Sequence, residues 1–305
     1  MHGVSLLHTA PTMRAAAALL IALLLAFVIS PPRIGSMVWL GALHDAGHVL
    51  TFAAIAVLLC AIARPRGAGF AVILGLLLLF GAGTELAQGA SGGDPSIGDV
   101  GRDLLGGVAG MLGWVGMRPR RPGLLAAAAL AIVAGLAPLA LTGWAYAQRA
   151  RQPQVVWDAG RATWSVFIET PRTGRLAHLP DPSRLRFTAE SDSYAGVVVR
   201  EPPPDWRGYA TLVVRAVNPG SAPIALNLRI DDQPRDTEYE DRFNRERIVP
   251  PRTQLQWRVP VAEIEHGPVG RLLDLSHVTR VVIFLSPGSR GEAFDLESLR
   301  LEPGP

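Results

Sequence analysis

The 305-residue chain has no lysine and only one cysteine, Cys60. A single cysteine excludes a disulfide within the chain, so cysteine content does not indicate the redox state of its compartment. Because lysine is absent, all 29 basic residues are arginines, and they nearly balance 26 acidic residues. The net charge of +3 describes neither half of the chain well, and we expect no nucleic-acid partner from it.

Acidic residues are scarce in the first 150 residues, which contain five of them beside nine arginines. The rest of this half is mainly Leu, Ala, Gly, Val and Ile, with apolar segments at about 15–30, 46–63, 68–88, 99–117 and 123–147. Each approaches or exceeds the roughly 17–25 residues with which a helix crosses a bilayer. Residues 151–305 hold 17 of the 25 prolines instead. The composition predicts a transmembrane α-helical bundle of about five helices over 1–150 and a second domain over 151–305.

The positions of the arginines predict how these helices are oriented. One side of the predicted membrane collects six of them: Arg14, Arg64, Arg66, Arg118, Arg120 and Arg121. On the other side, only Arg33 and Arg102 precede the last helix. Arg149 and Arg151 follow the last helix on that same side, which is the side with fewer arginines. Since cytoplasmic loops are enriched in arginine, we expect a cytoplasmic N-terminus, an uncleaved first helix and an extracytoplasmic second domain.

The five acidic residues of the first half fall in groups at the ends of apolar segments. Two histidines and one glutamine lie beside these acidic residues. The resulting groups are His44, Asp45 and His48; Glu85 and Gln88; and Asp94, Asp99 and Asp103. A charge at mid-membrane costs about 2.5–3.5 kcal/mol on insertion scales, so such residues usually mark function. Spacings of three and four residues put paired members on one helix face. The predicted topology places all groups at the same membrane face, as an outward-facing pocket.

Eight of the residues in this region carry a family resemblance: His48, Phe52, Glu85, Gln88, Ser96, Asp99, Gly106 and Gly110. Over about 38–117 their order and spacing resemble the VanZ-like membrane proteins, whose pattern runs from His-x-x-x-aromatic through Glu-x-x-Gln to Asp-x-x-x-Asn-x-x-Gly-x-x-x-Gly. Asp103 stands where that family usually has Asn, and Gly93 stands near a common Arg. The resemblance implies a cell-envelope membrane protein, linked through the family's namesake to teicoplanin tolerance, and it implies no particular reaction.

The same residues also have structural interpretations. Ser96 followed by Asp99 matches a capping box, and Gly106 with Gly110 is typical of close helix packing. If the groups form a site instead, the candidate catalytic residues are His48, Glu85, Asp99 and Asp103, and the candidate ligand-binding residues are His44, Asp45, Gln88 and Ser96. Carboxylates beside a histidine can perform acid–base chemistry. No metal-hydrolase motif is present, so we expect no metal, and the sequence favours a protein that is not an enzyme.

Residues 151–305 change from helical to alternating patterns. Short alternating segments, separated by Pro, Gly, Asp and Asn, lie at 163–169, 194–200, 210–217, 224–230, 254–261, 279–285 and 294–301. Seven or eight short strands with few helix signals predict an all-β antiparallel sandwich. A domain of about 150 residues can bury its own core without disulfides.

Three stretches of this second domain carry another resemblance: 206–209 (Trp-Arg-Gly-Tyr), 227–231 (Asn-Leu-Arg-Ile-Asp) and the closing pair 278–284 and 294–301. They are similar to the galactose-binding-like jelly rolls found in carbohydrate-binding modules. The resemblance implies a jelly-roll sandwich. Domains of this type often bind sugars, and many hold a structural calcium ion, the one cofactor that the resemblance leaves open. We expect Trp206 in the sandwich core rather than on a binding surface.

The loop predicted at 231–247 is the best ligand-binding candidate of the second domain. Its candidate residues are Asp231, Tyr239, Asp241, Arg242 and Asn244. An aromatic ring could stack on a sugar while the acids and arginine bond its hydroxyl groups, and a solvated hairpin with internal salt bridges is the alternative. The expected partners are membrane lipid and an envelope glycan or glycolipid. The other hypotheses are a membrane-interface enzyme acting on a lipid-linked substrate and an assembly domain that docks proteins, while ligand and oligomeric state stay open.

Overall fold

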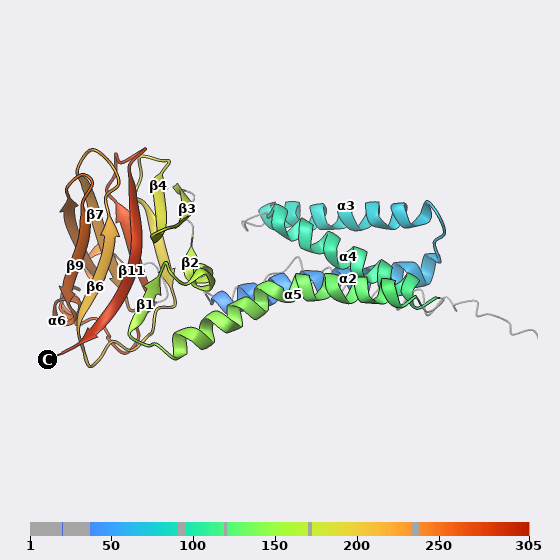
Figure 1. Cartoon of the computed structure of the whole chain (residues 1–305), viewed down its shortest axis with the longest axis horizontal. Coiled ribbons are helices and arrows are strands. Elements are labelled where there is room, and N and C mark those ends of the chain that lie inside the picture. Colours follow the sequence, from blue (N-terminus) through green and yellow to red (C-terminus); the bar gives the residue numbers. More distant parts are fainter. Residues whose placement is uncertain are drawn as a thin grey trace, which may run out of the picture. The chain divides into compact units, whose positions relative to one another are not determined.

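The structure is a computed structural model that describes residues 20, 37–90, 96–118, 121–169, 173–233 and 238–304, except for the side chain of Gln88. The chain divides into a helical unit that includes Trp39–Leu141 and a sandwich unit that includes Thr142–Pro305 (Figure 1). Each unit is described separately below. The predicted first span at 15–30 lies outside the described residues, apart from Leu20.

Four helices account for most of the described helical unit. They are α2 (Val38–Ala63), α3 (Gly69–Ala90), α4 (Ile97–Gly116) and α5 (Pro122–Ala150), the last of which continues into the sandwich unit. Among the described residues, α2, α3 and α5 are long and apolar enough to cross a membrane. Helix α4 has 20 residues but carries Asp99, Arg102 and Asp103 in its first two turns. By length and composition, the structure therefore supports three membrane-spanning helices.

Helix α2 begins eight residues before the predicted segment at 46–63. Trp39, Leu40 and Leu43 continue the apolar pattern, and neither His44 nor Asp45 is a strong helix breaker. The earlier start changes the position of His48, which lies ten residues, or about 15 Å, into the helix instead of near its end.

Glycines on α4 allow the helices to approach closely. A Cβ atom on Gly106 would overlap the carbonyl oxygen of Val49 on α2, and one on Gly110 would overlap that of Ala53. On another side of α4, a Cβ atom on Gly107 would lie 2.7 Å from the Leu77 side chain of α3. The predicted close packing at Gly106 and Gly110 is confirmed, and it brings the polar residues of three helices together.

Two antiparallel sheets form the sandwich unit. Among the described residues, one sheet contains six strands: β1 (Val155–Asp158), β3 (Gly174–Pro180), β4 (Ser183–Ala189), β6 (Tyr209–Val217), β9 (Gln254–Pro260) and β11 (Ala293–Pro303). The other contains five: β2 (Ile168–Glu169), β5 (Ala195–Arg200), β7 (Ile224–Asp231), β8 (Phe243–Val249) and β10 (Arg280–Leu285). The predicted antiparallel β-sandwich is confirmed.

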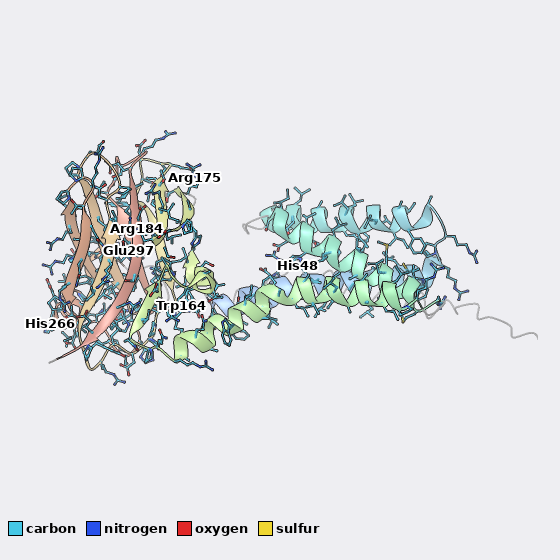
Figure 2. All side chains as sticks on the ribbon, in the orientation of Figure 1. His48, Trp164, Arg175, Arg184, His266 and Glu297 are labelled. Atoms are coloured by element: carbon cyan, nitrogen blue, oxygen red, sulfur yellow. The ribbon has the colours of Figure 1, made fainter. Side chains whose placement is uncertain are left out.

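The strand order explains how the core is closed. The longer sheet runs β3-β4-β11-β6-β9 with β1 also paired to β11, and the other runs β2-β5-β10-β7-β8. From β4 to β11 the chain changes sheet at every step except the β7–β8 hairpin, which is a jelly-roll arrangement. Trp157, Trp164 and Trp206 are fully buried between the sheets, so the core position expected for Trp206 is confirmed. On the outer face of the larger sheet, Arg184 pairs with Glu297 at 2.8 Å (Figure 2).

Six of the predicted strands match observed strands closely, but the one predicted at 163–169 is wrong. Residues Ala162–Phe167 form the 3₁₀ helix η1, and only Ile168–Glu169 are extended. Trp164 and Phe167 are both buried, and residues three apart share a face in a helical turn but not in a strand. The loop predicted at 231–247 is also too long, because residues 243–247 belong to strand β8. The short helix α6 (Val261–Glu265) has no counterpart among the predicted elements.

The last turns of α5 are built into the sandwich unit. Arg149 is buried, donates a 2.9 Å hydrogen bond from Nη2 to the carbonyl oxygen of Val156, and also donates to the carbonyl oxygen of Glu201. Its guanidinium lies 3.5 Å from the ring centre of Phe167. Tyr146 packs edge-on against the same ring and hydrogen-bonds the Glu201 carboxylate. These contacts give Arg149 a structural role in the sandwich unit.

Candidate functional site

Polar residues from three helices meet in the helical unit. His48 of α2 (labelled in Figure 2) and Asp103 of α4 form a buried pair, with Nδ1 and Oδ1 2.8 Å apart and only 1% of either side chain exposed. Glu85 near the end of α3 is also buried, and its Oε2 accepts a 2.5 Å hydrogen bond from the backbone N–H of Ser96. The structure thus brings together His48, Glu85 and Asp103, which the sequence predicts to be close.

Arg102 is the cation of this region. It forms an ion pair with Asp45 across helices, with Nη2 and Oδ2 3.0 Å apart, and another with Asp99 one turn away. The sequence analysis did not select Arg102 as a site residue, because the (i, i+3) spacing to Asp99 gives no sign of the longer-range contact with Asp45. We call Asp45, His48, Glu85, Asp99, Arg102 and Asp103 the helical polar cluster.

The remaining candidates of the helical unit are placed as follows. The His44 ring lies edge-on to the His48 ring, with centroids 4.8 Å apart. Ser96 occupies the N-cap position of α4, but the expected capping box is wrong, because the Ser96 side chain makes no capping hydrogen bond and its backbone N–H is used by Glu85. The side chain of Gln88, and all of Gly93 and Asp94, lie outside the described residues.

Three buried polar atoms of the helical polar cluster have no hydrogen-bond partner among the described residues. They are Nε2 of His48, Oε1 of Glu85 and Oδ2 of Asp103. Among the described residues, no group of three His, Cys, Asp or Glu side chains is arranged to hold a metal ion. The described part of the cluster thus consists of hydrogen-bonding carboxylates and an imidazole, with Arg102 at its partly exposed edge.

A second candidate is a groove of about 890 Å³ on the exposed face of the five-stranded sheet. The residues at the bottom of the groove form rows that run across the strands, because residues paired on neighbouring strands point to the same face of the sheet. One row contains Gly196 of β5, Phe284 of β10, Asn227 of β7 and Glu246 of β8, listed in their order across the sheet. The next row contains Val198, Val282, Arg229 and Asn244. The opposite face of the same strands is the apolar core, so the alternation itself creates a polar and aromatic floor.

Aromatic rings form part of this groove. A Cβ atom on Gly196 would overlap the carbonyl oxygen of Ile283 and the Cα and Cβ atoms of Phe284, so the glycine allows β5 to approach β10 closely where Phe284 stands. Tyr194 is 65% exposed and packs edge-on to Phe284, with ring centres 5.7 Å apart. Tyr239 is 69% exposed and also lines the groove, with the guanidinium group of Arg242 over its ring. The groove therefore offers exposed ring surface together with amide and guanidinium groups.

Asp231 holds two arginines of the groove in place from the same face of the sheet. Its carboxylate is fully buried and accepts hydrogen bonds from Nε of Arg229 and Nε of Arg280, each at 2.9 Å to Oδ2. Because the arginines come from neighbouring strands, one buried carboxylate fixes both against the sheet. Asp231 thus positions groove residues and does not itself line the groove.

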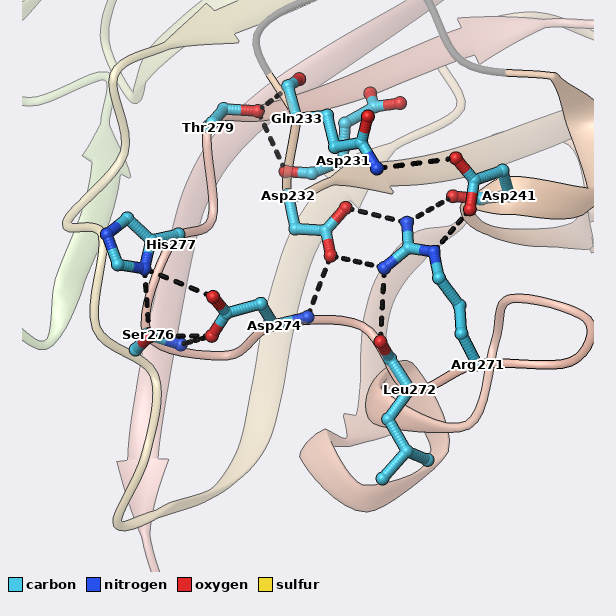
Figure 3. Close-up of polar contacts among 10 residues, drawn as sticks. All are labelled: Asp231, Asp232, Gln233, Asp241, Arg271, Leu272, Asp274, Ser276, His277 and Thr279. Carbon is cyan, nitrogen blue, oxygen red and sulfur yellow. Dashed lines mark hydrogen bonds and ion pairs between the residues drawn. The ribbon is translucent and has the colours of Figure 1, made fainter.

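Asp241 and Asp232 fix the segment that carries Tyr239 (Figure 3). Arg271 donates to Asp232 at 2.6 and 2.9 Å and also pairs with Asp241. Burial opposes ionisation of Asp232, but the hydrogen bonds from Arg271 and from the backbone N–H of Asp274 outweigh it and hold the pKa of Asp232 below 3.8. The same carboxylates raise the pKa of Arg271. Asp241 is therefore part of a salt-bridge network that supports the groove but does not line it.

Of the five predicted candidates in the second domain, Tyr239, Arg242 and Asn244 line the groove, whereas Asp231 and Asp241 support it. The sequence analysis missed the groove residues that lie outside the predicted loop: Tyr194, Asn227, Arg229, Arg280 and Phe284. They lie up to 37 positions from the nearest end of the loop, and only the strand register brings them to it. Exposed aromatic residues in alternating segments were the one available signal.

No protein-family model matches the chain. No curated protein sequence matches it either. Among solved structures, the chain is similar to an exo-beta-agarase, with 15% identity and a TM-score of 0.40 over 50% of this chain and 25% of the agarase. It is similar to a family 11 carbohydrate-binding module from Clostridium thermocellum in complex with a beta-1,3-1,4-mixed-linked tetrasaccharide, with 12% identity and a TM-score of 0.35 over 45% of this chain and 88% of the module.

A family 29 carbohydrate-binding module from Piromyces equi is also similar, with 8% identity and a TM-score of 0.31 over 45% of this chain and 81% of the module. The chain spans about a quarter of the length of the agarase. Similarities at these TM-scores do not identify a ligand for this chain, so its function has to be argued from its own groove and its own helices.

Proposed function

We propose that this chain is a membrane-anchored glycan-binding protein whose binding site is the groove on the five-stranded sheet. The observation that carries the proposal is that aromatic and polar side chains lie together in this groove. Phe284 forms part of its bottom and Tyr194 part of its edge, and Asn227 and Arg229 lie in the adjoining rows. An aromatic ring can cover the apolar face of a sugar ring, while amide and guanidinium N–H groups donate to its hydroxyl oxygens. A groove of about 890 Å³ has room for more than one sugar unit.

The helical unit serves in this proposal as the membrane anchor. We place five spans in it by adding α4 and the segment at 15–30 to the three apolar helices, because each of the five apolar segments in the sequence approaches the length that crosses a bilayer. The resemblance of residues 38–117 to VanZ-like membrane proteins agrees with a membrane location. The N-terminus would then be cytoplasmic and the sandwich extracytoplasmic, in the cell envelope, in contact with membrane lipid and an envelope glycan or glycolipid. Reporter fusions at positions 65, 93, 120 and 155 test this, and cytoplasmic signals at 93 and 155 would contradict it.

The binding experiment uses the full chain in lipid nanodiscs on an array of cell-envelope and plant polysaccharide fragments. We expect binding to at least one glycan and at least a ten-fold loss of affinity, equivalent to about 1.4 kcal/mol, in Tyr194→Ala. The matched control is Leu272→Ala, which removes another exposed apolar side chain, 55% exposed, that does not line the groove. Binding to no glycan, or equal losses in both variants, contradicts the proposal.

A membrane-interface enzyme acting on a lipid-linked envelope substrate is the second candidate. The observation in its favour is the His48–Asp103 pair, because a carboxylate that accepts from Nδ1–H leaves Nε2 of a neutral imidazole able to accept a proton. In that case Glu85→Gln abolishes the cellular phenotype of the protein at an unchanged protein level. A fall in protein level instead assigns Glu85 to structure alone.

A further inference from the structure

The helical polar cluster has an excess of negative charge that its own residues do not compensate. It contains four carboxylates, those of Asp45, Glu85, Asp99 and Asp103, and one arginine, Arg102. Arg102 is engaged with Asp45 and Asp99 at the partly exposed edge of the cluster. In the buried part, Asp103 is paired with His48 and also interacts electrostatically with Arg102, whereas the Glu85 carboxylate accepts a hydrogen bond only from the Ser96 backbone N–H among the described residues. Buried carboxylates without a counter-charge are costly, and the cost is largest in a membrane.

The three atoms without partners in this cluster are all acceptors. In the neutral tautomer in which Nδ1–H of His48 donates to Oδ1 of Asp103, Nε2 is an acceptor. Oε1 of Glu85 and Oδ2 of Asp103 are carboxylate oxygens, and both residues are at least 95% buried.

These atoms belong to one region of the bundle. Oδ2 of Asp103 lies 2.9 Å from the point where a Cβ atom on Gly81 would stand. Gly81 is one turn before Glu85 on the same face of α3. Glu85 also interacts electrostatically with both His48 and Asp103. Asp103 therefore contacts α3 on the helix face that carries Glu85, about one helical turn from it along the chain.

We propose that the helical polar cluster binds a primary ammonium group, which supplies one positive charge and three N–H donors to Nε2 of His48, Oε1 of Glu85 and Oδ2 of Asp103. This chemistry occurs in a lipid headgroup of the ethanolamine type and in soluble amines such as amino sugars. The three donors distinguish it from a quaternary ammonium group, which has the same charge and no N–H. The site is independent of the groove on the sandwich.

The test compares the two headgroups on the full chain. In native mass spectrometry from nanodiscs, we expect ethanolamine-headgroup lipid to be retained at least ten-fold more than choline-headgroup lipid of the same acyl chains. A soluble arm follows thermal stabilisation in detergent by ethanolamine and by tetramethylammonium. Retention in the lipid arm alone identifies a headgroup as the source, and stabilisation by ethanolamine but not tetramethylammonium identifies a soluble amine. Equal behaviour of the two ammonium types in both arms overturns the proposal.

Two conservative variants check that the cluster is responsible. Glu85→Gln keeps an oxygen for the Ser96 N–H but replaces the other acceptor by an NH₂ donor, and Asp103→Asn does the same while keeping the contact with His48. Each is expected to abolish the preference for the primary amine. Thr51→Val on α2, which also alters a buried polar side chain but not the cluster, should retain it. Should either cluster variant fold poorly, the other still decides, and a preference that survives in a folded variant overturns the assignment.

Discussion

Asp231 positions two of the arginines that line the groove. Its side chain is fully buried and holds Arg229 and Arg280. Asp231→Asn removes the charge that both guanidinium groups face, and losing one partner of a buried ionic group typically costs about 3–5 kcal/mol. We expect a destabilisation of about 3 kcal/mol, measured by urea unfolding of the full chain with the buried Trp157, Trp164 and Trp206 as fluorescence probes. Asp205→Asn, at an exposed ion pair with Arg207, should leave the midpoint unchanged.

Asp232 gives the sandwich a specific acid sensitivity. Hydrogen bonds from Arg271 and Asp274 lower the pKa of Asp232 in the folded chain against the opposing effect of burial. Its stabilising contribution is therefore complete above the unfolded value of about 3.9 and is lost as pH falls through the lower folded pKa. We expect Asp232→Asn to be destabilised at pH 6 and to converge with the natural chain in urea unfolding toward pH 2. Asp192→Asn, at an exposed position, should retain the full pH dependence.

At the scale of elements, α4 owes its position to its glycines. Gly106→Ala places a methyl group against the Val49 carbonyl of α2, and overpacking of this kind costs about 1–3 kcal/mol. The matched control is Gly101→Ala on the same helix, where nothing lies within 4 Å of the added methyl group. We expect a lower thermal midpoint in detergent for the first variant and no decrease for the second, since alanine favours a helix. Equal effects would mean that α2 and α4 do not pack through this face.

The end of α5 is held in the sandwich unit by the hydrogen bonds of Arg149. Arg149→Met keeps most of the side-chain volume but leaves the carbonyl groups of Val156 and Glu201 without their donor, at a cost of about 1–3 kcal/mol for each buried group. We expect the urea midpoint of the sandwich to fall accordingly. Arg151→Met, two residues further and exposed, should have little effect. A similar loss in both variants would argue against the buried role of Arg149.

For the whole molecule, the sequence predicts elements better than it predicts sites. Apolar length indicates α3 and α5 within a few residues, and alternation indicates β6, β7 and β10, because burial of a face leaves a local pattern. The sequence analysis missed β1, β3, β4 and β8. Of these, β3 is an edge strand with little buried surface, so its pattern is weak.

Contacts between distant residues leave no such pattern. The spacing of His48 and of Asp103 places each on a helix face, but only the packing of α2 against α4 makes them a pair. In the groove, Phe284 and Asn227 become neighbours through strand register, which the loop sequence at 231–247 does not contain. The sequence could therefore name members of both candidate sites without giving the complete set of either.

The central claim, that the groove of the sandwich binds a glycan, is tested most directly by hydrogen–deuterium exchange of the full chain in nanodiscs, with and without the tightest-binding glycan from the array. The account predicts slower exchange in β7, β8 and β10, whose residues line the groove, and unchanged exchange in β3 and β4 of the other sheet. Protection confined to the six-stranded sheet, or no glycan-dependent protection in the sandwich, would contradict it.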